Sequence, residues 1–412
     1  MRCNVVSRTI RTRVSGSTCA VSGLHRRVRE TQRSRNTAFP THRAPEAPRP
    51  IIHAEHNMTE VQWKRELEQS VRDLHTLGVL LDRPELSADP AAESVAREYP
   101  VLVPRPFLAK IDKTDPDDPL LAQVCPSIRE MEEVPGFTRD PLEEAGAAKT
   151  NRCLNKYHGR TLILASDACA VHCRFCFRKH FPKENPGPSP QETIRPDQDG
   201  ETASEETTPF SAISPMDRVC RQLQHVRCDP GIDEVILSGG DPLTLDNFAL
   251  NLYVEEIFRI SHVKRLRIHT RFPVMIPSRI DSDLSEILRA SKRCASYMVV
   301  HVNHPGELDD AFREKIGTLI DRGVPIMSQT VLLKKVNDCP GVLRKLFADL
   351  VDMRVLPYYL HLLDKISGTS HFEVGQEEAR VLMETMVRSL PGYAVPRLVR
   401  EVPGEKSKSF LF

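Results

Sequence analysis

The stretch Thr161-Leu-Ile-Leu-Ala-Ser166-Asp-Ala-Cys169-Ala-Val-His-Cys173-Arg-Phe-Cys176 places three cysteines directly after an aliphatic run. The run at 161–166 predicts a buried β-strand, and the cysteines would lie on the loop that follows it. Their spacing is C-x3-C-x2-C, and three thiolates on one loop can hold three irons of a 4Fe–4S cluster. A structural zinc site is the alternative, since His172 or His180 could add a fourth ligand. We favour the cluster because this spacing, at the end of a first strand and with Phe175 before the last cysteine, is specific.

Similar aliphatic runs recur along the chain and alternate with helical segments. The six runs are Thr161–Ser166, Glu234–Ser238, Arg265–His269, Tyr297–Asn303, Pro325–Leu332 and Pro357–Leu362. Segments of helical length, such as Asp246–Ile260 and Asp281–Lys292, lie between them. Strands that alternate with helices predict an α/β fold with a parallel sheet and right-handed crossovers. Several of the runs end in polar residues, and in a barrel that is the end where ligands bind.

Composition excludes several classes of protein. The chain has 412 residues, of which 40% are hydrophobic, so it can form a sizeable core. Its formal net charge of +1 argues against a globally basic nucleic-acid-binding protein. No apolar run reaches the length of about 18 residues that a membrane span requires. The eleven cysteines are odd in number and no secretory signal precedes them, so a disulfide framework is not expected.

Two segments differ in composition from the rest. The first fifty residues contain eleven Arg, no Lys and two acids, and we expect residues 1–57 to be disordered. They are either an organellar transit peptide or an over-long reading upstream of a start at Met58. Residues 184–210 contain seven acids and five prolines, which predicts a disordered surface insertion. Between these segments, Thr59 and Gln62 have the spacing of a capping box, which predicts a helix that runs from Thr59 to Gly78.

Motifs along the chain resemble the radical S-adenosylmethionine lysine 2,3-aminomutase family. Besides the cysteines they are Asp140-Pro-Leu-Glu-Glu144, Cys176-Phe-Arg-Lys-His-Phe181, Leu237-Ser-Gly-Gly-Asp-Pro-Leu243, His301-Val-Asn-His-Pro305 and Gln329-Thr-Val-Leu-Leu333. Four further segments resemble in particular the branch that β-lysylates elongation factor P: Val103–Phe107, Asp115–Gln123, Tyr358–Asp364 and Arg400–Glu405. The resemblance extends from about residue 60 to the end of the chain, apart from the acidic insertion.

The resemblance implies an architecture and three cofactors. It implies a partial (β/α)6 TIM-like barrel, open on one side, over residues 151–362. An N-terminal helical region would span 58–150, and a C-terminal segment that binds substrate and pyridoxal phosphate would span 363–412. The cofactors implied are a 4Fe–4S cluster, S-adenosylmethionine and pyridoxal 5′-phosphate. Together they would generate a radical able to break an unactivated C–H bond, while the protein positions them and excludes water.

The resemblance also implies roles for individual residues. The cluster ligands would be Cys169, Cys173 and Cys176. The residues near S-adenosylmethionine would be Ser238, Gly239, Gly240, Asp241, His301 and Gln329, with the glycines allowing close approach of the backbone to the ligand. Lys408 would form the imine with pyridoxal phosphate, with Lys406 as the alternative because Gly-Glu-Lys-Ser departs from the family's usual glycine run. The residues expected near this cofactor and its phosphate are Lys156, Tyr157 and Arg160.

The charges implied at the site indicate the substrate. Arg178 would bind the α-carboxylate, and Asp364 with Glu401 would bind a distal ammonium group. The expected enzyme is therefore an isomerase that transfers an amino group within L-lysine and makes (R)-β-lysine. Alternatives are a 2,3-aminomutase for another amino acid, or a non-catalytic iron–sulfur or zinc-binding protein. In the catabolic enzymes that the chain resembles, cysteines of a tail beyond the imine lysine bind zinc between subunits, and Cys339 lies where one such zinc ligand would be. This chain has no tail cysteines to partner Cys339, so we expect no zinc and a buried or half-buried Cys339 thiol.

Partners and location follow from the same resemblance. It implies elongation factor P and its lysyl ligase as functional partners, and an electron donor of the flavodoxin or ferredoxin type. No membrane and no nucleic acid are expected. The family's bacterial role implies the cytoplasm, and an organelle would replace it if residues 1–57 are a transit peptide.

Overall fold

The computed structural model describes residues 57–144, 148–150, 152–181, 214–289 and 294–412. The N-terminal extension expected at 1–57, except for its last residue, and the insertion expected at 184–210 lie outside the described residues.

Within the described residues, the strands form one ten-stranded sheet in which spatial order follows chain order. The strands are β1 (Ala148–Thr150), β2 (Cys153–Leu154), β3 (Arg160–Ser166), β4 (Glu234–Gly239), β5 (Arg265–Thr270), β6 (Ala295–His301), β7 (Ile326–Val331), β8 (Leu356–His361), β9 (Arg397–Arg400) and β10 (Ser409–Phe410). All neighbours from β3 to β9 pair in parallel. Strands β1, β2 and β10 pair in antiparallel fashion at the two ends. The carboxyl ends of seven strands therefore meet at one edge of the sheet.

The mixed α/β fold predicted from the sequence is confirmed. Each of the six expected strands is present, with ends that differ by no more than two residues. Strand β4 is buried at its four central positions, which is typical of parallel strands covered on both faces. Strand β9 was not expected, because Arg397–Arg400 is short and has an arginine at each end.

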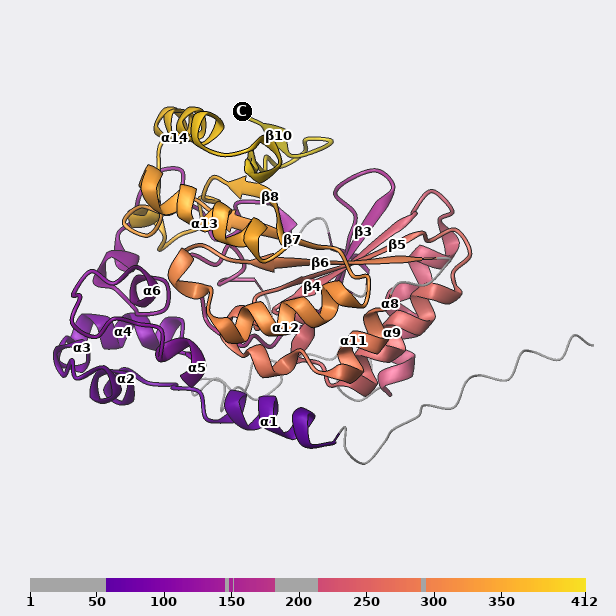
Figure 1. Ribbon diagram of the computed structural model, residues 1–412, viewed down its shortest axis with the longest axis horizontal. Coiled ribbons are helices and arrows are strands. Elements are labelled where there is room, and N and C mark those ends of the chain that lie inside the picture. Colours follow the sequence, from indigo (N-terminus) through magenta and orange to yellow (C-terminus); the bar gives the residue numbers. More distant parts are fainter. Residues whose placement is uncertain (1–56, 145–147, 151, 182–213, 290–293) are drawn as a thin grey trace, which may run out of the picture. The chain divides into compact units, whose positions relative to one another are not determined.

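Helices connect consecutive parallel strands. The crossover helices are α8 (Pro215–Cys228), α9 (Asn247–Arg259), α10 (Phe272–Met275), α11 (Ser282–Leu288), α12 (Asp310–Asp321), α13 (Pro340–Asp352) and α14 (Gln376–Ser389). Figure 1 shows that they accompany the strands in chain order, and α9 contacts both α8 and α11. Aspartates Asp246, Asp281 and Asp309 each accept a hydrogen bond from the first turn of the helix that follows, which fixes the helix starts. The helix expected at Asp281–Lys292 ends earlier, at Leu288.

The region before the sheet is helical. It contains α1 (Asn57–Glu68), α2 (Leu74–Leu81), α3 (Glu85–Ala88), α4 (Pro90–Glu98), α5 (Arg105–Leu108) and α6 (Pro119–Ala122). Single-turn 3-10 helices occur here and later as η2 (Ile128–Met131), η4 (Pro242–Thr244), η5 (Pro277–Arg279), η6 (Pro305–Glu307), η7 (Ser370–Phe372) and η8 (Gly392–Ala394). None of the helices in the described part of the chain has the length and apolar character that crossing a membrane requires.

The single helix expected from Thr59 to Gly78 is wrong. Helix α1 ends at Glu68, and Val71 is extended because its backbone exchanges hydrogen bonds with Val103 at 2.8 and 2.9 Å. Asp73 then caps a new helix, α2. Trp63 of α1 is buried and packs edge-on against Phe272 at a centroid distance of 5.7 Å, so this region shares the core of the sheet.

Candidate functional site

A cavity of about 560 Å³ is lined by residues of the parallel strands, by the loops that follow their carboxyl ends, and by the segment that precedes β3. Every site residue predicted from the sequence lines this cavity. They are Cys169, Cys173, Cys176, Arg178, Lys156, Tyr157, Arg160, Ser238, Gly239, Gly240, Asp241, His301, Gln329, Asp364, Glu401 and Lys408. The fold therefore brings together residues from segments that are far apart in the chain.

The three cysteines lie on the loop after β3, and all are half-buried. The loop is anchored through its backbone, since His172 N donates to Leu102 O at 3.0 Å and Arg174 N donates to Gln123 O at 2.9 Å. Burial, with the neighbouring Cys173, raises the pKa of the Cys176 thiol to about 11. In the parts of the chain that the structure describes, no three His, Cys, Asp or Glu side chains converge as they would on one metal ion.

Gly239 and Gly240 are required where β4 meets the cysteine loop. Gly239 has φ +123°, and a Cβ on it would lie 2.3 Å from Ser166 O. A Cβ on Gly240 would lie 2.2 Å from Ala168 O. We expected these glycines to admit a ligand, and the structure shows that they admit the backbone of the cysteine loop.

Asp241 anchors the same turn with its carboxylate. The side chain accepts hydrogen bonds from Leu243 N at 3.0 Å, Thr270 Oγ1 at 2.8 Å and Arg271 N at 2.8 Å. Burial raises its pKa to about 6 even though these hydrogen bonds favour the charged form. The carboxylate therefore joins the ends of β4 and β5.

A buried acid, Glu144, and a half-buried acid, Glu401, alternate with three cations along one side of the cavity. Arg178 donates from Nε and Nη2 to Glu144 at 2.6 and 3.0 Å, a bidentate pair. Lys156 Nζ lies 2.9 Å from Glu144 Oε1 and 2.8 Å from Glu401 Oε1. Lys408 Nζ contacts the other oxygen of Glu401. Each of the three cations thus has a carboxylate partner within the protein itself.

A hairpin positions Glu401 and Lys408. Strand β10 pairs with β9 so that Ser409 lies opposite Arg400, and the loop between the strands begins at Glu401 and ends at Lys408. The two side chains therefore face each other at the base of the loop. Lys406 lies within the loop and is exposed, whereas the Lys408 side chain is 21% exposed.

The two acids expected to bind a distal ammonium differ in charge state. Burial alone would raise the pKa of Glu401, but Lys408 and Lys156 outweigh it and lower the pKa to about 2. Burial, and then the negative charge of Glu401, raise the pKa of Asp364 to about 7. Near neutral pH, Glu401 is ionised and Asp364 is close to its titration midpoint.

Three half-buried histidines present buried ring nitrogens. The Nε2 atoms of His269, His301 and His361 are buried and have no hydrogen-bond partner among the described residues. All three line the cavity, and burial lowers the pKa of each, so they are neutral. Buried polar atoms normally have a partner, so these nitrogens are suited to a polar ligand in the cavity.

Comparisons with known proteins identify the family. No family model matches the chain. The L-lysine 2,3-aminomutase of Escherichia coli (strain K12) is 39% identical over 348 residues, which cover 84% of this chain and 93% of that protein. The enzyme of the same name from Haemophilus influenzae is 38% identical over 363 residues, covering 87% of this chain and 97% of that protein. The chain belongs to the L-lysine 2,3-aminomutase family. A solved structure, Streptococcus suis SuiB bound to S-adenosylmethionine, is 15% identical, and the match covers 63% of this chain and 54% of that chain. Its TM-score is 0.38, so the similarity is too weak to bear on the fold.

Lysine 2,3-aminomutases are isomerases that transfer an amino group within one molecule, so the predicted enzyme class is confirmed. The family resemblance seen in the sequence is confirmed as well.

Sequence reasoning missed several residues of the cavity. Glu144 was part of a quoted motif, Asp140–Glu144, but had no assigned role. Glu144 directly follows another acid, Glu143, so the sequence did not mark it out, and its burial became visible in the structure. Arg271 and His269 were also missed, because each resembles an ordinary strand-end residue until the sheet is assembled. His361 was expected as a polar strand end but had no assigned role.

Cys339 differs from its expectation. It is exposed and occupies the N-cap position of α13, so the expected buried or half-buried thiol is wrong.

Proposed function

We propose that this chain converts L-lysine to (R)-β-lysine. In this isomerisation the amino group moves from C2 to C3 and one hydrogen atom moves from C3 to C2, so the composition is unchanged. The observation that carries the proposal is that the three cysteines, Arg178, Asp364, Glu401 and Lys408 line a single cavity. Membership of the lysine 2,3-aminomutase family supports the reaction class.

We assign a 4Fe–4S cluster to Cys169, Cys173 and Cys176, with S-adenosylmethionine beside it. The residues fit these groups, since the thiols share one loop and each would bind a separate iron, so they need not converge on one ion. His301 Nε2 is buried at the cavity without a partner in the described residues. When bound, the two cofactors supply one-electron chemistry that can break an unactivated C–H bond. Ser238, Gln329 and His301 line the same cavity and would hold the polar edges of S-adenosylmethionine.

We assign pyridoxal phosphate to the side of the cavity that contains Lys408. Its Nζ is the half-buried amine, and Lys406 is exposed, so Lys408 is the better placed for covalent attachment. Glu401, the ionised neighbour of this amine, holds Lys408 Nζ in place at the cavity. When bound, pyridoxal phosphate supplies an electron sink for the migrating amino group.

The phosphate of this cofactor would lie near Lys156, Tyr157 and Arg160. The Arg160 guanidinium lies 5.9 Å from the centre of the Tyr157 ring, which fixes both side chains at the cavity wall. Lys156 is already paired with Glu144 and Glu401. To bind the phosphate it would have to exchange one of these carboxylates for a phosphate oxygen.

The substrate would be bound at its two charged ends. Arg178 is held by Glu144 through Nε and Nη2, while Nη1 makes only long contacts of 3.3 and 3.4 Å to Ser238 Oγ and Gly239 O. Nη1 is therefore the guanidinium nitrogen that can donate hydrogen bonds to a substrate carboxylate. Asp364 and Glu401 would bind the distal ammonium of the substrate. At Glu401 this ammonium would take the place of the side-chain amines of Lys156 and Lys408.

We propose the architecture that goes with this chemistry. Residues 58–150 form the N-terminal helical region, 151–362 form a partial (β/α)6 barrel and 363–412 form the segment that holds pyridoxal phosphate. The chain-order parallel sheet and the pairing of β10 with β9 support this division. The tail would close the cavity and exclude water from it.

We also propose that (R)-β-lysine is made for elongation factor P and its lysyl ligase. The support is the resemblance of Val103–Phe107, Tyr358–Asp364 and Arg400–Glu405 to that branch of the family. A flavodoxin- or ferredoxin-type protein would supply the electron, and the location would be the cytoplasm, or an organelle if residues 1–57 are a transit peptide. A strain without the gene should lose β-lysyl-modified elongation factor P by mass spectrometry, and unaltered modification would contradict this role.

Anaerobic reconstitution tests the main proposal. The purified protein should bind about four irons and four sulfides, and should form β-lysine from L-lysine with S-adenosylmethionine, pyridoxal phosphate and reductant. Changing Cys169, Cys173 or Cys176 to Ala should abolish the cluster and S-adenosylmethionine cleavage together. The exposed Cys228 provides a matched control, since Cys228→Ala should change neither. Zinc in place of iron, or full turnover by a cysteine variant, would refute the assignment.

A further inference from the structure

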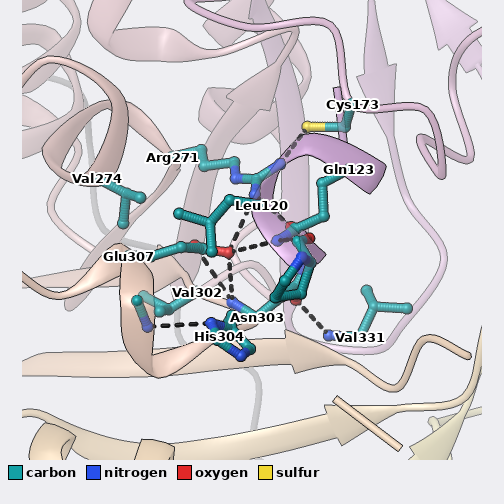
Figure 2. A network of polar contacts seen from close by, with 12 residues as sticks. Leu120, Gln123, Cys173, Arg271, Val274, Val302, Asn303, His304, Glu307 and Val331 are labelled. Atoms are coloured by element: carbon teal, nitrogen blue, oxygen red, sulfur yellow. Dashed lines mark hydrogen bonds and ion pairs between the residues drawn. The ribbon is translucent and has the colours of Figure 1, made fainter. Parts of the chain in front are cut away.

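Arg271 donates a hydrogen bond to one of the three cysteines. Its Nη1 lies 2.7 Å from Cys173 Sγ, as Figure 2 shows. Arg271 follows β5 directly, and it is separated from Cys173 by 98 positions in the chain. Cys173, one of the three predicted cluster ligands, thus contacts the guanidinium directly.

The guanidinium is fixed by a buried polar network. Arg271 Nη2 donates to Gln123 Oε1 at 2.6 Å and lies 3.4 Å from Glu307 Oε1. Gln123 Nε2 donates to the same Glu307 oxygen at 2.9 Å, and Asn303 Nδ2 donates to Gln123 Oε1 at 3.0 Å. Gln123, Asn303 and Glu307 are fully buried. Figure 2 shows these side chains converging on the guanidinium from separate segments.

Two aromatic rings restrict the same group further. The Arg271 Cζ atom lies 5.3 Å from the centre of the Phe175 ring and 5.9 Å from that of Phe107. Phe175 belongs to the cysteine motif itself. Arg271 Nε is buried, and it has no acceptor within the described residues, so the side chain has hydrogen-bonding capacity left.

The physical consequence concerns the cluster's electron affinity. Reduction adds negative charge to an iron–sulfur cluster, and a hydrogen bond or a positive charge at a ligand sulfur stabilises the reduced form. Burial keeps water and salt from screening this charge. The Glu307 carboxylate opposes the effect, because it partly neutralises the guanidinium.

We propose that Arg271 is a positioning residue that orients Cys173 and raises the reduction potential of the cluster, with Glu307 as the counterion that limits the increase. This inference rests on the proposed function, since it requires a cluster at the three cysteines. It assigns to the buried network a role in electron transfer to the cluster in addition to its role in stability.

The test is a redox titration of the reconstituted protein without S-adenosylmethionine, monitored by electron paramagnetic resonance. Arg271→Gln should lower the potential by about 59 mV or more, a tenfold change in the equilibrium constant of a one-electron couple. Arg271→Lys keeps the charge but loses the planar fork, so it should recover part of the shift. Glu307→Gln should move the potential in the opposite direction, which general damage to the fold would not do.

Arg279 provides the matched control. It is also a buried arginine, and it donates to the carbonyls of Leu243 and Leu245. Arg279→Gln should leave the potential of any assembled cluster unchanged. If Arg271→Gln fails to assemble a cluster, the Glu307→Gln variant decides. A cluster potential in Glu307→Gln above that of the wild type supports the inference, and an unchanged potential overturns it. An unaltered potential in Arg271→Gln also overturns it, while a wild-type protein that binds no cluster refutes the proposed function instead.

Discussion

At the scale of single residues, Glu144 and Glu401 divide the cations of the cavity between them. Glu144 pairs with Arg178 and Lys156, and Glu401 pairs with Lys156 and Lys408. Loss of one partner of a buried ion pair leaves the other charge uncompensated, at a cost of about 3–5 kcal/mol. A lysine substrate can replace these protein partners at both ends. Its carboxylate would pair with Arg178, and its distal ammonium would pair with Glu401.

Asp364→Asn tests whether Asp364 binds the distal ammonium of the substrate. Without the carboxylate, kcat/KM for lysine should fall by roughly two to three orders of magnitude, since about 3–5 kcal/mol of charge pairing is lost. Uncoupled cleavage of S-adenosylmethionine should persist, because the cysteine loop is untouched. The exposed Asp352 of α13 is the control, and Asp352→Asn should behave as the wild type. Lysine turnover by Asp364→Asn at the wild-type rate would contradict the lysine assignment.

The raised pKa of Asp364 also predicts a pH dependence. Burial and then Glu401 raise this pKa to about 7, Glu144 adds to the rise, and Lys408 and Lys156 oppose it. Below that pH Asp364 gains a proton and cannot pair with an ammonium, so lysine binding weakens as pH falls, on the order of tenfold per unit at most. Calorimetric titration of lysine between about pH 6 and pH 8 should show this slope, and Asp364→Asn should remove it. An equal slope in both proteins would contradict the role of Asp364.

At the scale of elements, the β9–β10 hairpin gives the two tail lysines different surroundings. Both line the cavity, but Lys408 is half-buried beside Glu401 and Lys406 is exposed. Lys408→Ala should abolish the visible absorbance of bound pyridoxal phosphate, and Lys406→Ala should preserve it. Lys406 serves as the matched control, because it is a lysine of the same loop that is exposed. Borohydride reduction followed by peptide mapping gives an independent readout, and a label on Lys406 would overturn the assignment. Deletion of residues 403–412 should abolish cofactor binding as well, since it removes β10.

The contact between β4 and the cysteine loop gives a second prediction at this scale. Gly240→Ala should destabilise the protein by about 1–3 kcal/mol, because the added Cβ would lie 2.2 Å from Ala168 O. It should also lower iron content, since the cysteine loop must move. Gly392→Ala is the control, as nothing lies within 4 Å of its added Cβ, and it should change stability by less than about 0.5 kcal/mol. Thermal unfolding and iron analysis check both, and equal stability of the two variants would contradict the predicted clash.

At the scale of the whole molecule, the helical region before the sheet and the sheet itself share one core. Trp63 of α1 is buried against Phe272 of α10, and it is the only tryptophan of the chain. Tryptophan fluorescence and far-UV circular dichroism should therefore report one coincident unfolding transition. An earlier fluorescence transition would show that the region 58–150 unfolds separately. Trp63→Ala should cost about 3–5 kcal/mol, whereas Val79→Ala at an exposed position should cost little.

Sequence alone determined the alternation of strands and helices, the cysteine loop and the family. These features depend on residues close together in the chain, such as an aliphatic run of six residues or three cysteines with short spacing, and local periodicity reveals them. The motifs also indicated which side chains to expect at the site, and the comparisons confirmed the family and the isomerase class.

Tertiary structure alone decided which of these residues meet. Arg178 pairs with Glu144 across 34 positions, Lys156 with Glu401 across 245, and Arg271 with Cys173 across 98. Such contacts depend on crossover geometry and strand register, which no local pattern encodes. The same reason explains why the helix expected from Thr59 was interrupted, since Val71 pairs with a strand-like segment at Val103. The charge state of Asp364 and the role of the two glycines likewise became visible only when the sheet and its loops were assembled.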